Sequence, residues 1–137
     1  MIQRVQTIWL LLAAIVVFLS LQLSFYNGTL IADNAYHHVI ATENNLMIMV
    51  LTSALGSALV INIFLFRYRS IQIKICVAAL IAELLILLLY VLQVKNYSSG
   101  TFSLWSVLHL VTLVSIIMAI ISVRRDEKLV KDSNRLR

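Results

Sequence analysis

Four long apolar stretches alternate with short polar stretches along the chain. The apolar stretches cover residues 7–25, 46–66, 75–94 and 104–123, and each has about the 20 residues that a helix needs to cross roughly 30 Å of hydrocarbon. The chain contains no proline, so these helices should be continuous, unlike the broken helices of many transporters. The pattern predicts an all-α fold: a transmembrane four-helix bundle that runs up-down-up-down as one membrane domain, followed by a basic tail over residues 124–137.

The polar loop between the first two apolar stretches is long for a helical bundle. It covers residues 26–45, whereas bundle helices are usually joined by about 2–8 residues. An Asn-Gly turn signal precedes two short β-branched or aromatic segments, residues 29–32 and 35–42. These segments predict a small hairpin on the membrane surface. The loop over residues 95–103 is shorter and is predicted to be a simple turn around Gly100.

Two of the apolar stretches carry small or polar residues at helical spacing. In the second, Gly56 lies among serines and alanines at positions 53, 54, 57 and 58, which predicts a packing face that lets a neighbouring backbone approach closely. In the fourth, small and polar residues follow one another at spacings of three or four, so they form one stripe that should face protein. The stripe consists of His109, Thr112, Ser115, Ala119 and Ser122.

Composition supports a membrane protein. Of the 137 residues, 61% are hydrophobic and 12% are charged, whereas soluble domains have roughly 45–50% apolar and about 25% charged residues. The formal charge of +5 could suggest nucleic acid, but the basic residues lie at helix ends rather than on a soluble face, so no nucleic-acid partner is expected. The single cysteine, Cys76, excludes an intrachain disulfide and a cysteine-rich metal cluster.

The basic residues predict the orientation. Arg4, three residues within 67–74 and six within 124–137 lie on one side of the predicted bundle, and only Lys95 lies on the other. Short loops rich in lysine and arginine stay in the cytoplasm. Both termini should therefore be cytoplasmic (N-in/C-in), with the hairpin and the second loop outside.

Glu83 is the only Asp, Glu, Lys or Arg within the four apolar stretches. A carboxylate near the middle of a membrane costs a few kcal/mol or more unless it is protonated, paired or facing a polar interior. Counting at about 1.5 Å per residue from the cytoplasmic helix ends puts Ser57 and Ser115 near its level. His109 comes about one to two turns nearer the outside, and Asn62 about one turn nearer the inside.

Two hypotheses follow for this polar file of Glu83, His109, Ser57, Ser115 and Asn62. In one, Glu83 and His109 relay protons or cations, as intramembrane carboxylate and histidine chains do. In the other, Glu83 is protonated, hydrogen-bonded to Ser57 or Ser115, and serves only to set the register of the helices.

Other chemistry finds little support in the sequence. His37, His38 and Glu43 include suitable metal ligands, but adjacent histidines cannot share one face of a strand, so no metal is expected. A bis-histidine haem would need a second chain, because only His109 lies inside a span, and no cofactor is expected. The chain has neither a Ser/His/Asp constellation nor a glycine-rich phosphate loop, which argues against an enzyme.

Three segments carry a family resemblance: MIQRVQTIWLLLAA at residues 1–14, RYRSIQIKIC at 67–76 and RRDEKLVKDSNRLR at 124–137. Together they resemble a family of small bacterial four-helix inner-membrane proteins whose domain has no known function. The resemblance implies a multi-pass protein of the bacterial cytoplasmic membrane and brings no catalytic residue with it. It emphasises the cytoplasmic side, because the matching segments contain Gln3, Arg4, Gln6, Gln72, Lys74, Asp126, Glu127 and Arg135.

The leading functional hypothesis is a non-enzymatic accessory or scaffold subunit that acts through its basic cytoplasmic face. The tail suits anionic lipid headgroups, and Leu129, Val130 and Leu136 could dock on a membrane-protein partner or on a second copy of the chain. The alternative is a small oligomeric protein that transports a proton, cation or solute by means of Glu83. The predicted cytoplasmic interaction residues are Gln3, Arg4, Arg67, Arg69, Lys74, Arg124, Arg125, Asp126, Glu127, Lys128, Lys131 and Arg135.

Overall fold

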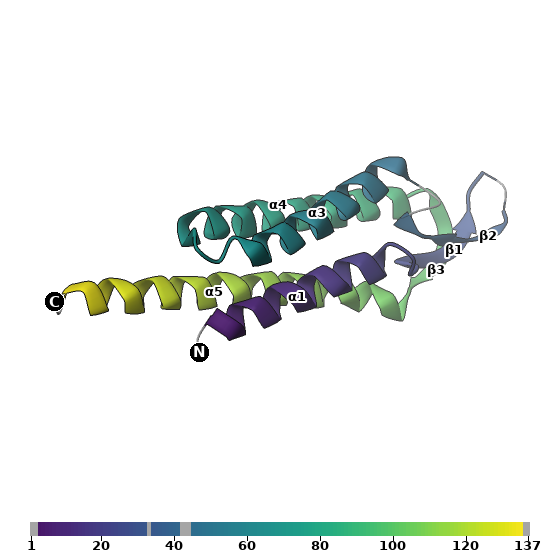
Figure 1. Cartoon of the computed structure of the whole chain (residues 1–137). Helices are drawn as coiled ribbons and strands as arrows, with labels where there is room; N and C mark the ends of the chain where they lie inside the picture. The colour runs from purple at the N-terminus through teal and green to yellow at the C-terminus, as the bar shows by residue number, and fades with distance from the viewer. Residues whose placement is uncertain (1–2, 33, 42–44, 136–137) are drawn as a thin grey trace.

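The computed structural model describes residues 3–32, 34–41 and 45–135, and this part of the chain forms four long α-helices and one small sheet (Figure 1). The helices are α1 (Gln3–Ser20), α3 (Leu46–Phe64), α4 (Arg69–Val94) and α5 (Val107–Arg135), with a 3₁₀ turn η1 (Leu104–Ser106) before α5. The strands are β1 (Tyr26–Leu30), β2 (Tyr36–Val39) and β3 (Tyr97–Phe102). The fold is therefore mostly helical, and the sheet corrects the all-α prediction.

The four helices pack side by side, so that each contacts two neighbours. Helix α1 contacts α3 and α5, and α4 contacts the same two helices. The buried face of each helix supplies apolar residues to one core, among them Leu10, Leu55, Ile86 and Ile116. Both ends of the chain lie at the end of the molecule opposite the sheet (Figure 1). The basic residues that flank the helices are thereby brought to one end.

The outward faces of the helices are also apolar. Ile81 is 62% exposed and Val114 is 56% exposed, although both belong to the most apolar part of their helices. Within the described residues, three helical segments are long and apolar enough to cross a membrane, namely Leu46–Phe64, Arg69–Val94 and Leu104–Asp132. The apolar part of α1, Val5–Ser20, is shorter. Apolar residues on both the inner and the outer face of a helix indicate lipid rather than water outside.

The helix ends differ from the limits of the apolar stretches. Helix α1 ends at Ser20 rather than Phe25, and the backbone N–H of Phe25 donates to Val39 O of β2 instead of to a helical carbonyl. Helix α4 begins at Arg69, six residues before the predicted start, and α5 continues through the tail to Arg135. The limits of an apolar stretch do not mark the ends of a helix, because a helix can continue into polar residues.

The predicted small-residue packing face is only partly buried. Gly56 faces α1, where a Cβ atom built on it would lie 2.9 Å from the Phe18 ring. Ala54 and Ser57 are exposed on the outside of α3. Glycine at position 56 therefore serves the contact between α1 and α3, and most of its small neighbours do not.

The sheet has the strand order β2-β1-β3, with both pairs antiparallel. The pairing of β1 with β2 confirms the predicted hairpin. The prediction of a turn at Asn27 and Gly28 is wrong, because both residues lie within β1 and pair with His38 and His37. Strand β3 was not predicted, because residues 95–103 were interpreted as a turn. Gly28 faces Gly100 across β1 and β3, and a Cβ atom on Gly28 would lie 2.5 Å from Ser99 O. The two glycines let the strands come this close beneath the Tyr26 ring.

Candidate functional site

Glu83 and His109 form a direct polar contact between α4 and α5. His109 Nδ1 lies 2.7 Å from Glu83 Oε1, and the two residues are only 3% and 1% exposed. Glu83 faces inward because it belongs to the buried stripe of α4, where Ala79, Glu83, Ile86 and Tyr90 follow at spacings of three and four. The contact is an ion pair when the imidazole is protonated and the carboxyl is ionised, and otherwise it is a hydrogen bond. We call it the Glu83–His109 pair.

Aromatic rings enclose this pair. Phe25 and Tyr90 stack with their centroids 4.4 Å apart, and both rings contact His109 edge-on, at 5.4 Å and 5.2 Å. Phe25 directly precedes β1, so the sheet holds one wall of the enclosure in place. The Tyr90 hydroxyl is buried and has no hydrogen-bond partner in the described part of the chain. Low polarity around a polar contact strengthens its electrostatics and raises the cost of breaking it.

The other members of the predicted polar file lie elsewhere. Ser115 is buried, but its hydroxyl donates to the backbone oxygen of Val111 at 2.7 Å. Ser57 is exposed on α3 and donates to Ser53 O at 2.8 Å. Asn62 lies near the last turn of α3. The structure therefore joins Glu83 to His109, and neither serine takes the role of hydrogen-bond partner that the sequence suggested for it.

A second group of buried polar side chains joins the end of α3 to the start of α4. Asn62 Nδ2 donates to Gln72 O at 3.3 Å and to Cys76 Sγ at 3.0 Å, while Gln72 Nε2 donates to Asn62 O at 3.3 Å. Gln6 is also buried, and its side-chain amide has no partner among the described residues. Sequence reasoning found Gln72 and Gln6 only through the family resemblance. In the sequence, each of these glutamines lies at helical spacing from residues of the buried face, and this spacing could have identified them.

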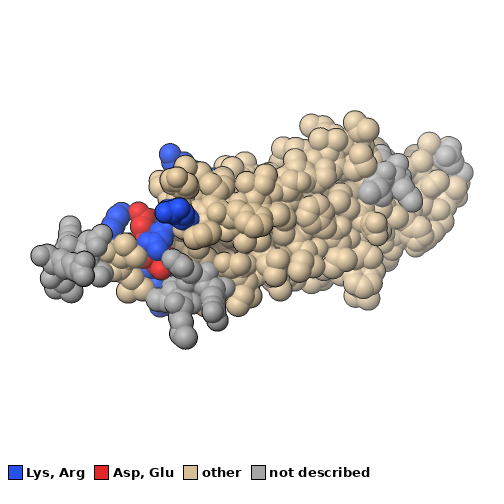
Figure 2. Space-filling view, in the orientation of Figure 1, with Lys and Arg blue, Asp and Glu red and all other residues tan. Residues whose placement is uncertain are grey.

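Charged side chains gather at the end of the molecule that carries the chain termini (Figure 2). Arg69 Nη2 lies 2.9 Å from Asp126 Oδ2, which ties the start of α4 to α5. Glu127 and Lys131, four residues apart on α5, form an ion pair at 2.7 Å. The hydrogen bond and the positive charge of Lys131 lower the pKa of the Glu127 carboxyl. The exposed basic residues here are Arg67, Lys74, Arg124, Arg125, Lys128 and Lys131.

Some predicted interaction residues cannot be placed in this cluster. For Gln3, Arg4 and Arg135 the structure describes the backbone only, and Leu136 lies outside the described residues. The exposed apolar residues of the tail are Leu129 and Val130, at 48% and 40%.

The histidines of the hairpin are separated by the alternation of strand β2. His37 is half-buried, whereas His38 is exposed and its Nδ1 lies 2.8 Å from Asn27 Oδ1. Glu43, the third member of the weighed metal site, lies outside the described residues. Across residues 3–32, 34–41 and 45–135, no three His, Cys, Asp or Glu side chains are grouped so that they could hold a metal ion.

These features define a mostly helical protein with helices long and apolar enough to span a membrane, a buried carboxylate–histidine pair and a small sheet at one end. Residues 2–136 match the family described as "Domain of unknown function (DUF4293)". The chain therefore belongs to this family, as its terminal segments and second loop suggested. No curated protein and no solved structure matches the chain.

Proposed function

We propose that the chain is a four-span integral protein of the bacterial inner membrane, arranged up-down-up-down with both termini in the cytoplasm. Ten of its 11 lysine and arginine residues flank the apolar stretches on one side of the bundle, and only Lys95 flanks them on the other; such a bias keeps the basic side cytoplasmic. Helix α1 has 18 residues and is about 27 Å long at 1.5 Å per residue, close to the roughly 30 Å of a hydrocarbon core. The sheet then lies on the outer surface.

Reporter fusions test this orientation. An alkaline phosphatase fused after the C-terminus should be inactive and a green fluorescent protein there should fluoresce, because the tail stays inside. Insertions at Asn34 and Ser99 should give the opposite pattern. A phosphatase that is active at the C-terminus would refute the proposed topology.

Within that membrane the protein acts as a non-enzymatic accessory or scaffold subunit through its basic end. The observation that carries this proposal is the length of α5. Its 29 residues make a helix of about 43 Å, which exceeds a hydrocarbon core of roughly 30 Å by about two and a half turns. The ion pair between Arg69 and Asp126 anchors the base of this extension. Beyond it, Leu129 and Val130 are exposed between Lys128 and Lys131, a surface suited to docking.

Co-purification from native membranes tests the scaffold role. Full-length protein should capture a stoichiometric partner, and protein lacking Lys128–Arg137 should insert equally well but lose that partner. A matched variant, Leu129→Ser with Val130→Ser, keeps every charge and should lose the partner as well, because the apolar contacts supply the docking energy. Full retention of the partner by both variants would reduce the tail to a stop-transfer signal.

A second candidate function is proton or cation transport by a homo-oligomer that uses the Glu83–His109 pair. The observation that favours it is the 2.7 Å contact between two titratable groups that are almost fully buried, a combination associated with intramembrane proton relays. Purified wild-type protein and Glu83→Gln protein in sealed vesicles separate the two functions. Proton flux in wild type that disappears in the folded variant supports transport, and absence of flux in both supports the scaffold.

A further inference from the structure

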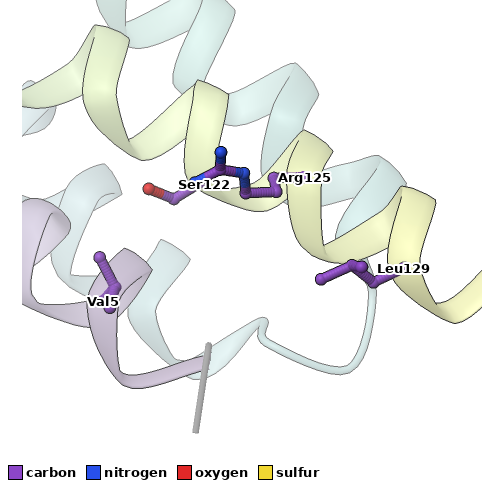
Figure 3. Close-up of a pocket in the computed structure, with 4 residues that line it drawn as sticks. All are labelled: Val5, Ser122, Arg125 and Leu129. Atoms are coloured by element: carbon purple, nitrogen blue, oxygen red, sulfur yellow. The ribbon is translucent and has the colours of Figure 1, made fainter.

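Two hollows follow one another along the contact between α1 and α5. The first lies at the basic end and has a volume of about 340 Å³; Val5, Ser122, Arg125 and Leu129 line it (Figure 3). The second has a volume of about 230 Å³ and lies deeper in the apolar part of the same contact. We call them the basic-end hollow and the apolar hollow. The apolar hollow is lined by Trp9, Leu12, Leu110, Val111, Val114 and Ser115.

Helical geometry puts both hollows on the same side of the contact. Val114 and Arg125 are eleven residues apart on α5, which is about three full turns and about 16 Å. Val5 and Leu12 are seven residues apart on α1, which is about two turns and about 10 Å. The hollows are thus in line, and the distance between them is comparable to the roughly 15 Å depth of one leaflet of a bilayer core.

The basic-end hollow presents two unused donors. The Arg125 guanidinium makes no ion pair or hydrogen bond with a described residue, in contrast to Arg69, which is paired with Asp126. The Ser122 hydroxyl also has no partner in the described chain, whereas Ser115 on the same stripe donates to its own helix backbone. Figure 3 shows Ser122 and Arg125 close together along α5, with Val5 coming from α1. An arginine fork and a hydroxyl are suited to phosphate oxygens.

We propose that the contact between α1 and α5, with its two hollows, binds one anionic phospholipid. The lipid phosphate lies on Arg125 and Ser122, and an acyl chain lies in the apolar hollow. The site rests on the proposed membrane placement, in which the basic end lies at the cytoplasmic headgroups and the apolar hollow lies in the hydrocarbon. Polar donors at the basic-end hollow and a second, apolar hollow deeper along the same contact match the two parts of a lipid. A soluble anion would use only the first part, and a peptide would have to enter the bilayer to reach the second.

Trp9 reports on the site because it lines the apolar hollow and is one of only two tryptophans. Trp105→Phe leaves Trp9 as the only indole, and Trp9→Phe leaves Trp105, which is 52% exposed beside the sheet. Each protein is reconstituted into phosphatidylcholine vesicles that contain a small fraction of acyl-brominated phosphatidylglycerol or, in parallel, brominated phosphatidylcholine. Bromine quenches an indole that it contacts.

We expect Trp9 to be quenched by the brominated anionic lipid with about fivefold preference over the zwitterionic one, the factor that one arginine contributes at an anionic surface. Arg125→Gln should abolish the preference. Arg124→Gln removes the same charge from the neighbouring exposed residue and should keep it. An excess of inorganic phosphate should leave the quenching unchanged, because the acyl chain holds the lipid in place.

Several outcomes would overturn the lipid site. Equal quenching of Trp9 by both lipids would show no headgroup selection, and equal loss in the Arg124 and Arg125 variants would show only general surface charge. Reversal by inorganic phosphate would identify a free-anion site. Quenching of Trp105 without any quenching of Trp9 would mean that a second protein chain, and not lipid, covers the two hollows between α1 and α5. If no lipid quenches either tryptophan, the proposed membrane placement is wrong. The other outcomes overturn only the lipid site and leave the membrane placement intact.

Discussion

A double-mutant cycle on the Glu83–His109 pair tests whether this contact, rather than a serine, satisfies the buried carboxyl. The perturbations are Glu83→Leu, which removes the carboxyl at similar volume, and His109→Phe, which keeps a ring against Phe25 and Tyr90. Each single variant leaves the other polar group buried without its partner, since the pair is 1% and 3% exposed. The double variant leaves neither group behind.

The magnitude follows from the geometry and from the solvent. Removing one partner of a buried pair costs about 3–5 kcal/mol in water-soluble proteins. Hydrogen bonds between membrane helices are weaker, averaging about 0.6 and reaching about 1.7 kcal/mol, because polar groups find other partners in the unfolded state within the membrane. The 2.7 Å distance and the aromatic enclosure place this pair near the upper limit. We expect a coupling free energy of about 1.5 kcal/mol.

Reversible unfolding in mixed micelles, followed by circular dichroism, measures the free energy of unfolding of the four proteins. A control cycle pairs Glu83→Leu with Ser115→Ala, whose hydroxyl bonds only to its own helix. That cycle should be additive within about 0.5 kcal/mol. Additivity in the Glu83 and His109 cycle, or a coupling that moves to Ser115, would refute the reasoning.

Three further predictions concern the sheet and the tail. Gly100→Ala should destabilise the sheet by about 1–3 kcal/mol, because its Cβ would collide with the Asn27 backbone oxygen. Amide exchange of β1 measures this, and unchanged exchange in the variant would contradict the collision. Glu127 has its pKa lowered below the ordinary 4.5 by Lys131, so the pair stabilises the end of α5 above about pH 4.5 and is lost as the pH falls through the folded value. Tail helicity should therefore drop on acidification, and a pH-independent signal in wild type would contradict this. A protein ending after Glu127 should keep the helicity and thermal stability of the spans, since the anchoring Asp126 remains; unfolding at a markedly lower temperature would argue against a tail that serves only docking.

The sequence by itself determined the helices, the hairpin and the separation of charge along the chain. These features depend on local patterns. A run of about 20 apolar residues needs a hydrocarbon environment, and two short β-branched or aromatic segments separated by polar turn residues form a hairpin. Basic residues that flank the apolar stretches on one side of the bundle come together at one end of it. Even the inward orientation of Glu83 was local, since it shares a stripe with Ala79, Ile86 and Tyr90.

Tertiary structure alone decided which groups meet. The partner of Glu83 depends on the rotation of each helix about its axis and on the offset between α4 and α5, and both are set by packing between distant residues. Counting from the apolar limits put Ser115 at the level of Glu83, whereas the structure pairs Glu83 with His109, six residues earlier on α5. Ser57 lies five residues from buried Asn62 on α3, about 140° around the helix, which turns it outward. Strand β3 likewise forms because β1 offers it an edge. Its own sequence, with two serines and a glycine in six residues, favours a turn, so only the neighbouring strand makes it a strand.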